Sequence, residues 1–494
     1  MAQESVQETA SGGLMRTKPI DRLRQDAEGG GHGLERTLGP WSLVGLGIGA
    51  IIGAGLFSLT GIAAAENAGP AVVISFAIAA IGCALAGMCY SELASMIPVS
   101  GSAYTYAYAT MGEFVAWIIG WDLVLEYAVG AATVSVSWSK YVATLLQDWG
   151  VTLPPRLLHS PFETVTLADG SSVHGLVNLP AVLILCLISL LLMRGVRESA
   201  RVNGVIVVVK VAVVLAVVGV GLFYVKAQNY VPFIPDNTGT FGEYGWSGIM
   251  RAAGVVFFAY IGFDAVSTAA QEVKNPQRTM MTGILGSLAI CTVLYIAFAA
   301  VLTGLVPYAQ MKGDAAPVAT AIKQTPFPWL QSLVTLGVIA GFTTVMLVLL
   351  YGQSRVFYAM ANDRLLPKFF AAIHPTWRTP YRSNLFFMVF AALLGGLTPI
   401  STLGHMTSIG TLLAFIIVCA GVVIMRRTHP DEPRGYRTPL VPIVPVAGIL
   451  VCLAMMLSLD GETWLRLVIW LGIGLAIYFG YGRRHSRVGR EAAR

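Results

Sequence analysis

Residues 45–57 read GLGIGAIIGAGLF, with five glycines in thirteen positions of an otherwise apolar run. Glycine inside a water-soluble helix costs about 1 kcal/mol relative to alanine. A stretch that is both this apolar and this rich in glycine therefore needs an explanation from its surroundings in the chain.

The whole chain has the composition of an integral membrane protein. Of its 494 residues, 55% are hydrophobic and only 12% are charged, about half of the roughly 25% found in ordinary globular domains. A helix needs about 20 apolar residues to cross a hydrocarbon core of about 30 Å. Twelve apolar stretches are candidate spans, at 41–64, 71–96, 112–140, 179–193, 203–225, 249–271, 282–305, 329–351, 384–400, 406–425, 441–458 and 464–481.

Lipid offers the backbone no hydrogen-bond partners, so a spanning segment must satisfy its own N–H and C=O groups. The sequence therefore predicts an all-α integral membrane protein with twelve transmembrane helices. We expect membrane lipids around it and a monomer as the functional unit.

Several function classes are disfavoured by the same pattern. All six cysteines fall inside the apolar stretches, which is typical of reduced thiols rather than of a disulfide framework. The seven histidines show no metal-binding spacing, so we expect no metal, no cofactor and no intramembrane enzyme. The pI near 9 follows from membrane topology, and we expect no nucleic acid as a partner.

Positive charge is distributed unevenly between alternate loops. With a cytoplasmic amino terminus, 24 of the 32 lysines and arginines fall on the cytoplasmic side. Lysine and arginine concentrate in cytoplasmic loops, so we predict that both termini face the cytoplasm of a cell in whose inner or plasma membrane the protein lies. The segments that carry this charge are 1–39, 194–201, 272–279, 351–382, 426–439 and 482–494.

Four parts follow from this pattern. We predict a cytoplasmic, disordered amino-terminal tail at 1–39 and a ten-helix transport core at 40–425. Two additional transmembrane helices occupy 426–482, and a basic cytoplasmic tail occupies 483–494. Since no soluble domain interrupts the spans, the work of the protein is expected inside the membrane.

Two of the spans carry matching interruptions. The first has GAIIGAG at 49–55, and the sixth has VVFFAYIGFDAV at 255–266, with Gly262 and Asp264 inside an apolar run. Interrupted helices at corresponding places in two halves indicate a transporter built from inverted repeats. They predict a substrate site near the middle of the membrane.

The opening stretch has three interpretations. A nucleotide-binding G-x-G-x-x-A fingerprint is excluded, since that motif needs a preceding strand in a soluble unit. The spacing of Gly45, Gly49 and Gly53 also fits close helix packing. Residues 53–55 fit a break that turns backbone amides toward a cavity, because irregular backbone is tolerated at membrane depth only in such places. The last two interpretations are compatible.

The chain resembles the amino acid–polyamine–organocation superfamily, and within it the cationic amino acid transporter family and its bacterial permeases. The resemblance is dense and colinear over about residues 34–485. It rests on GIGAIIGAGLFSLTG (47–61), AGPAVVISF (68–76), CYSELASMIPVSGSAYTYAY (89–108), GEFVAWIIGWDLVLEYAV (112–129) and FFAYIGFDAVSTAAQEVKNPQR (257–278).

This resemblance implies a LeuT-type arrangement, in which two inverted five-helix repeats are followed by two further helices and helices 1 and 6 are unwound at the substrate. It implies that Ile51, Ile52, Gly53, Ala54 and Gly55 face the carboxylate of an amino acid. Phe258, Ala259 and Ile261 would meet its amino group through carbonyls and gate the pocket.

One residue departs from the family pattern. Relatives often carry a hydroxyl residue between the two glycines, where this chain has Ala54. Backbone amides at the positive end of a half-helix still bind a carboxylate. One side-chain hydrogen bond is lost, which predicts a lower substrate affinity.

Lys210 interrupts the apolar run VIVVVKVAVV. An ionisable residue within a membrane span is a candidate for function, and a desolvated lysine alternates readily between its charged and neutral forms. As ammonium it would bind carbonyls of helix 1, where sodium-coupled relatives of this fold place a cation. The alternative is a lysine whose ammonium reaches back to the cytoplasmic surface.

Acidic residues form the second group of candidates for proton coupling. Asp122 and Glu126 lie one turn apart in the third span, and Asp264 follows the interruption of the sixth. Each fits a structural hydrogen-bonding role as well as proton coupling. Glu66 and Glu92 lie near helix ends, where we expect water, and we assign them no role.

The function predicted from the sequence is secondary active import of small neutral L-amino acids with protons, by alternating access. The segment of helix 8 expected to face the pocket, GFTTVMLVLLYGQ at 341–353, contains no acid, and Leu349 and its neighbours offer methyl groups to a substrate. A cationic side chain would need a nearby carboxylate, which Glu126 or Asp264 could supply. Transport or exchange of arginine, lysine or a polyamine is therefore the alternative, ahead of a channel or an amino-acid sensor.

Overall fold

The computed structural model describes residues 14–20, 23, 39–97, 102–166, 172–195, 200–268, 273–314 and 316–491. These residues are mostly helical. In the described residues one small sheet is present, in which β1 (Thr164–Thr166) pairs antiparallel with β2 (Ser172–His174). Val165 lies opposite Val173 in this hairpin.

The helices up to the middle of the chain include two π-helical turns at places that matter below, η1 and η4. In order they are α2 (Pro40–Ile51), η1 (Gly55–Leu59), α3 (Thr60–Ala63), η2 (Ala64–Ala68), η3 (Gly69–Ala71), α4 (Val72–Met96), α5 (Ser102–Thr110), α6 (Glu113–Val124), η4 (Leu125–Val129), α7 (Gly130–Asp148), η5 (Pro155–Leu157), α8 (Leu179–Met193), α9 (Ala200–Gly221), η6 (Leu222–Tyr224) and η7 (Ala227–Tyr230).

The remaining helices begin with a second interrupted one, α10 to α11. In order they are α10 (Gly245–Val256), η8 (Phe257–Tyr260), α11 (Ala265–Thr268), α12 (Pro276–Leu305), η10 (Tyr308–Met311), α13 (Pro317–Ile322), α14 (Pro328–Asn362), η11 (Lys368–Ala371), α15 (Tyr381–Leu397), α16 (Ile400–Thr428), α17 (Ile443–Ser458), α18 (Gly461–Ile477), η12 (Tyr478–Gly482), α19 (Arg483–His485) and α20 (Arg487–Glu491).

All twelve predicted spans coincide with helical segments in the described residues, although 269–271 lie outside them. Within the described residues, seven helical stretches are long and apolar enough to cross a membrane. They are Gly55–Met96, Glu113–Asp148, Gly204–Tyr224, Gln277–Leu305, Pro328–Asn362, Ile400–Thr428 and Gly461–His485. Shorter apolar helices are Pro40–Ile51, Leu179–Met193, Tyr381–Leu397 and Ile443–Ser458.

Proline marks several of the helix starts. Pro40, Pro276, Pro317 and Pro328 are the first residues of α2, α12, α13 and α14. The first N–H of a helix has no intrahelical acceptor, so proline loses nothing there and its fixed φ suits the helix. The predicted eighth span ended at residue 351, but α14 continues to Asn362, because polar residues such as Gln353 are buried there among other helices.

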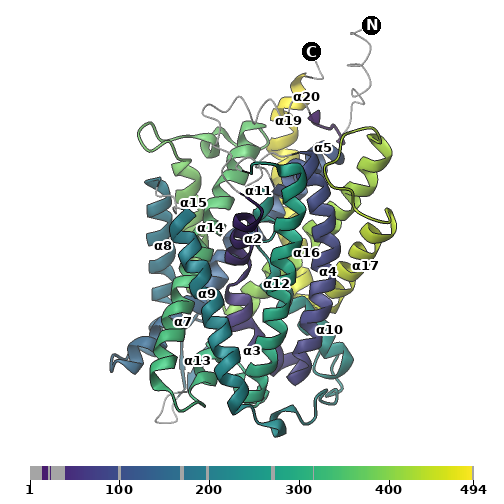
Figure 1. Ribbon diagram of the computed structural model, residues 1–494. Helices are drawn as coiled ribbons and strands as arrows, with labels where there is room; N and C mark the ends of the chain where they lie inside the picture. Colours follow the sequence, from purple (N-terminus) through teal and green to yellow (C-terminus); the bar gives the residue numbers. More distant parts are fainter. Residues whose placement is uncertain are drawn as a thin grey trace.

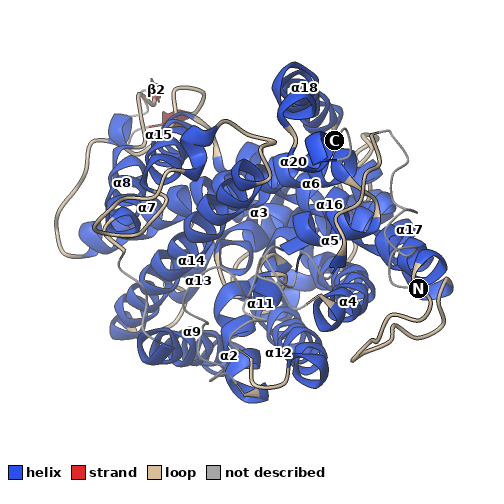
Figure 2. Ribbon diagram, turned by 90° about the horizontal axis from the view of Figure 1, so that it is seen from above, coloured by secondary structure: helices blue, strands red, loops and turns tan. Residues whose placement is uncertain are grey.

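The long helices run roughly side by side, and several reach from one end of the molecule to the other (Figure 1). Seen end-on in Figure 2, α3 lies near the middle of the bundle, whereas α8, α9, α17 and α18 lie toward its edge. The second half of the first interrupted helix thus lies in the interior, whereas α2 lies nearer the edge of this view. Ile51, Ile52 and Ala54 are buried, so the break itself lies between other helices.

The predicted disorder of the tail 1–39 stays a prediction, since 1–13, 21–22 and 24–38 lie outside the described residues; residues 14–20 are described. The amide of Glu113 donates to the Arg16 carbonyl at 2.8 Å, and Lys18 forms a buried ion pair with Asp363 at 3.0 Å. This segment therefore lies against the starts and ends of helices far along the chain. Sequence composition alone does not register such pairing, since the partner of Lys18 is 345 positions away.

Candidate functional site

The first break lies between α2 and η1. Ile52 leaves the helical conformation, with φ −70° and ψ 106°, and the helix restarts at Gly55. The Gly53 carbonyl accepts from the amides of Leu56 and Phe57, both at 3.2 Å. The first amides of the restarted half-helix have no partner within it, so they form a positive end at residues 53–55.

The second break follows α10. The chain passes through η8, becomes extended at Ile261 (ψ 137°), turns at Gly262 with φ 113° and resumes as α11. The Phe258 carbonyl accepts from the amide of Ile261 at 3.2 Å. Both interruptions predicted from the sequence are thus present as breaks in the helical backbone.

The two breaks touch each other, and this contact explains why glycine is present at Gly55 and Gly262. A Cβ on Gly55 would lie 2.2 Å from the Cα of Ala259, and one on Gly262 would lie 2.8 Å from the Ala50 carbonyl oxygen. Any larger side chain at either position would push the half-helices apart. Gly262 also has a positive φ that other residues rarely adopt.

Among the earlier glycines, a close approach is found at Gly47, which is not one of the predicted positions Gly45, Gly49 and Gly53. A Cβ on Gly47 would lie 2.5 Å from the Ser287 hydroxyl oxygen, so this glycine lets α2 approach α12 closely. A Cβ on Gly45, by contrast, would meet no atom within 4 Å. The close-packing motif predicted to begin at Gly45 therefore makes no close contact there.

Tyr295 of α12 joins the two breaks, and the sequence reasoning missed it. Its hydroxyl lies 2.9 Å from the carbonyl oxygen of Ile51 and 2.9 Å from that of Ala259. A phenol carries one hydrogen, so it donates to one of these carbonyls at a time. The available signal was a tyrosine in the middle of the apolar stretch 282–305.

Lys210 of α9 reaches the first interrupted helix. It is 1% exposed, and its Nζ donates to the Gly49 carbonyl at 2.7 Å, just before the break. Its Cε fits against Gly341 of α14, where a Cβ would lie only 2.9 Å away. The side chain therefore points into the protein, which removes the interpretation that its ammonium lies at the membrane surface.

The three acidic candidates gather on other elements, around η4. Asp122 and Glu126 are each 1% exposed, and none of their carboxylate oxygens makes a hydrogen bond in the described residues. Glu126 lies beside Asp264, whose Oδ2 accepts from the Tyr127 hydroxyl at 2.8 Å. Lys210 thus lies beside the first break, whereas the cluster of three acidic residues lies apart from it, beside the second break.

An apolar wall flanks the breaks. A Cβ on Gly53 would lie 3.4 Å from Val345 of α14, and Leu349 lies one turn further along the same face. Phe258, Ile261, Val345 and Leu349 keep 6–7% of their surface exposed, whereas Ile52 and Ala54 keep none.

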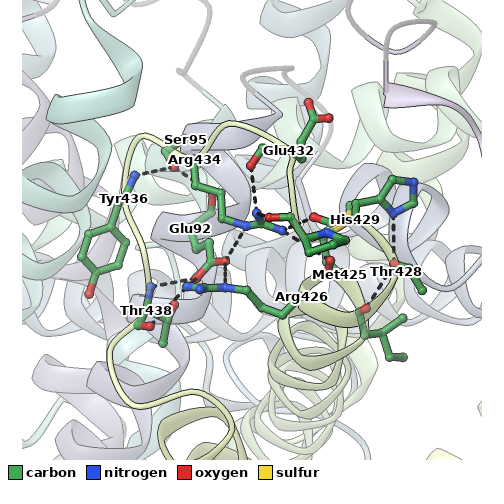
Figure 3. Close-up of polar contacts among 12 residues, drawn as sticks. Glu92, Ser95, Met425, Arg426, Thr428, His429, Glu432, Arg434, Tyr436 and Thr438 are labelled. Atoms are coloured by element: carbon green, nitrogen blue, oxygen red, sulfur yellow. Dashed lines mark hydrogen bonds and ion pairs between the residues drawn. The ribbon is translucent and has the colours of Figure 1, made fainter.

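Glu92 differs from the expectation that water surrounds it. Figure 3 shows its carboxylate held by Arg426, whose Nε and Nη2 lie 2.7 and 2.9 Å away, and by the Thr438 amide at 2.7 Å. Arg434 approaches it at 3.2 Å and donates to backbone carbonyls, including that of Met425 near the end of α16. This cluster ties α4 to the end of α16 and the segment that follows it.

Comparison with known protein families assigns the chain to a family of membrane transport proteins. A family model described as amino acid permease matches residues 38–477. The chain belongs to this family. Like its relatives, this permease is a multi-pass membrane protein of the amino acid–polyamine–organocation superfamily.

Individual relatives cover nearly the whole permease. A methylthioribose transporter of Bacillus subtilis is 44% identical over 96% of this chain and 98% of its own length. A branched-chain amino acid permease of the same organism is 44% identical over 97% and 99%. A chloroplastic cationic amino acid transporter of Arabidopsis thaliana is 34% identical over 92% and 89%. These relatives are named as transporters and permeases, and the permease is accordingly no enzyme.

Proposed function

We propose that this permease is a secondary active transporter that imports small neutral L-amino acids together with protons, by alternating access. The arrangement proposed for it is LeuT-type, with twelve transmembrane helices in two inverted five-helix repeats plus two further helices. Both termini face the cytoplasm of a cell whose inner or plasma membrane holds the protein. No cofactor is required, and the coupling ion is H⁺.

The observation that carries the proposal is the meeting of two helix breaks inside the bundle. Residues 53–55 offer unpaired amides at the positive end of a half-helix, which suits a carboxylate. The breaks touch at Gly55 and Ala259, so a ligand held by one is close to the carbonyls of the other. An α-amino acid carries the two charges that such a pair of half-helices recognises.

Proton coupling is supported by Lys210. Its ammonium binds the Gly49 carbonyl at 2.7 Å, immediately before the first break. Protonation therefore acts on the backbone that binds substrate, because a neutral amine holds that carbonyl less strongly. Asp122, Glu126 and Asp264 are the further candidates to carry a proton.

The neutral substrate class is supported by the apolar wall at Val345 and Leu349. An unpaired buried cationic side chain is costly. The alternative, a cationic substrate, is favoured by the proximity of Glu126 and Asp264 to the second break, and by relatives named as cationic amino acid transporters. Competition of an amino-acid panel and of methylthioribose against radiolabelled alanine separates these substrates; arginine competing better than alanine would contradict the neutral assignment.

Reconstitution into proteoliposomes tests the coupling. We expect an inward proton gradient to drive alanine accumulation regardless of sodium, and strict sodium dependence would overturn the proton assignment. Lys210→Ala is expected to abolish gradient-driven accumulation while alanine still raises the melting temperature of the purified protein. The matched control is Lys226→Ala, which changes an exposed lysine. Concentrative uptake by the Lys210 variant equal to that of the control would remove this lysine from the mechanism.

A further inference from the structure

Three residues, Gly130, Leu349 and Thr407, form a corner at the end of the apolar wall, which we call the Gly130 corner. Gly130 is the first residue of α7, directly after the π-helical turn η4. A Cβ built on it would lie 3.5 Å from the Leu349 Cδ1 and 3.5 Å from the Thr407 Cγ2. Three elements, α7, α14 and α16, thus meet at this point.

The corner has room for a methyl group. Separations of 3.5 Å are ordinary van der Waals contacts, unlike the 2.2 Å at Gly55 or the 2.6 Å between a Cβ on Gly120 and the Met360 sulfur. Gly55 is required by packing, since any side chain there would collide with backbone, and at Gly120 Met360 would have to move. Gly130 is not required in this way, because alanine would fit there and its φ and ψ of −58° and −45° are helical.

The corner lies within reach of a substrate side chain. Val345 contacts the Gly53 position, and Leu349 follows one turn later on the same face of α14, about 5.4 Å along the helix. A substrate whose carboxylate binds at the amides of 53–55 would have this wall beside it, and Gly130 adjoins the wall at Leu349.

The surface of the corner is apolar even though one of its residues is a threonine. The Thr407 hydroxyl donates to the Leu403 carbonyl of its own helix at 3.0 Å, which leaves its methyl group toward Gly130. Thr411 and Thr133 bond their own helices in the same way, at 3.0 and 2.9 Å. The hydrogens of these hydroxyls are thus donated within their own helices, so the Thr407 hydroxyl has no further hydrogen to donate to a substrate at the corner.

We propose that the Gly130 corner sets the size and polarity of the transported side chain, and that it admits neutral L-amino acids with branched aliphatic side chains up to leucine and isoleucine. This inference rests on the proposed amino acid transport and names the residue that limits it. The absent Cβ of Gly130 leaves the space that the terminal methyl groups of such a substrate occupy.

The test is the ratio of leucine to alanine transport in proteoliposomes. Gly130→Ala fills the corner with one methyl group, and one methylene in an apolar pocket changes discrimination by about tenfold or more. We expect kcat/KM for leucine to fall about tenfold while that for alanine changes by less than about twofold. Gly219→Ala is the control, because it places the same change in α9, where a Cβ meets no atom within 4 Å.

A compensating variant separates pocket size from helix packing. Thr407→Ser removes the methyl group that faces Gly130 and keeps the hydroxyl that bonds Leu403. In Gly130→Ala/Thr407→Ser the leucine-to-alanine ratio is expected to return toward the wild-type value. A purely structural role would not produce this recovery.

The outcomes distinguish this inference from the function on which it rests. If wild-type protein transports no amino acid under a proton gradient, the proposed function fails. If it transports alanine and leucine but Gly130→Ala leaves their ratio unchanged, or lowers both equally, the corner does not select the side chain. Lysine or methylthioribose transported better than leucine by the wild type would also overturn the inference.

Discussion

Buried carboxylates have opposite surroundings in two regions of this fold, at Glu92 and at the pair Asp122 and Glu126. Glu92 accepts hydrogen bonds from Arg426 and from the Thr438 amide and lies 3.2 Å from Arg434. Asp122 and Glu126 are as deeply buried, yet in the described residues none of their carboxylate oxygens has a hydrogen-bond partner.

The difference separates a structural carboxylate from one available for protons. An ionised carboxylate that lies in a protein interior without partners is costly, and protonation relieves this cost. Glu92 is surrounded by donors, which stabilise its charge. Asp122 and Glu126 have no such cluster of arginines around them in the described residues, and gain and loss of a proton is the role proposed for them above. Partners, more than burial, therefore distinguish the two groups.

The largest effect on stability is expected for Glu92→Ala. The change leaves Arg434, whose side chain is 1% exposed, without its carboxylate, and breaking a buried pair in this way costs about 3–5 kcal/mol. Thermal unfolding in detergent measures the loss. Asp431→Ala, at an exposed position of the same connecting segment, is the control and should change stability by less than about 0.5 kcal/mol. Equal melting temperatures for the two variants would show that the cluster is not needed for stability.

Glu126→Gln is expected to have the opposite profile. It replaces a carboxyl group that has no hydrogen bond by a neutral group of similar shape. The free energy of unfolding should therefore change by no more than about 1 kcal/mol, as in ordinary substitutions, and the melting temperature should shift little. Loss of a proton-carrying group removes concentrative uptake, which we expect to fall by tenfold to a hundredfold or more. Flux measurements with and without a pH gradient report this loss. Normal gradient-driven uptake in Glu126→Gln, and equally in Asp122→Asn, would assign both residues to structure.

Tyr295→Phe tests whether the bridge between the two breaks matters. The variant removes the hydroxyl that lies 2.9 Å from the carbonyls of Ile51 and Ala259. One hydrogen bond contributes about 0.5–1.5 kcal/mol, so kcat/KM for alanine should fall by up to about tenfold. Tyr230→Phe is the matched control, because its hydroxyl also bonds a carbonyl of α12, that of Ala300, away from the breaks. If both variants lower transport equally, the bridge has no special part in substrate binding.

The smallest effect is expected at Asp460, a well-partnered carboxylate outside the spans. It accepts from the Thr463 amide at 3.0 Å as the N-cap of α18, and the hydrogen bond with His405 holds the pKa of Asp460 well below its usual range. Asp460→Ala should cost about 1 kcal/mol at pH 7.

The pH dependence of this cost has a definite sign. A carboxyl group with a lowered folded-state pKa stabilises the protein above its ordinary pKa, near 4, and this stabilisation is lost as pH falls through the folded value. The melting temperatures of wild type and Asp460→Ala should therefore differ above the ordinary carboxyl pKa and converge as pH falls below about pH 4. A difference that persists unchanged to pH 3 would contradict this account.

Much of the fold was predictable because it depends on local composition. Apolar runs of 15 to 29 residues predicted the helical segments, and the interruptions at 49–55 and 255–266 predicted both breaks. The buried direction of Lys210 was one of two open alternatives, since a sequence places a lysine on a helix without showing which neighbour it meets. The Gly49 carbonyl settled its direction.

The sequence by itself determined the membrane class, the helices, the breaks and the family of this permease, because hydropathy and glycine content act within a single segment. The tertiary structure alone decided which polar groups have partners. It placed Glu92 among arginines more than 300 positions away, left Asp122 without a hydrogen bond in the described residues and brought Tyr295 to both breaks. Such pairings depend on how distant helices pack, and the free energy of a buried charge is set by those neighbours.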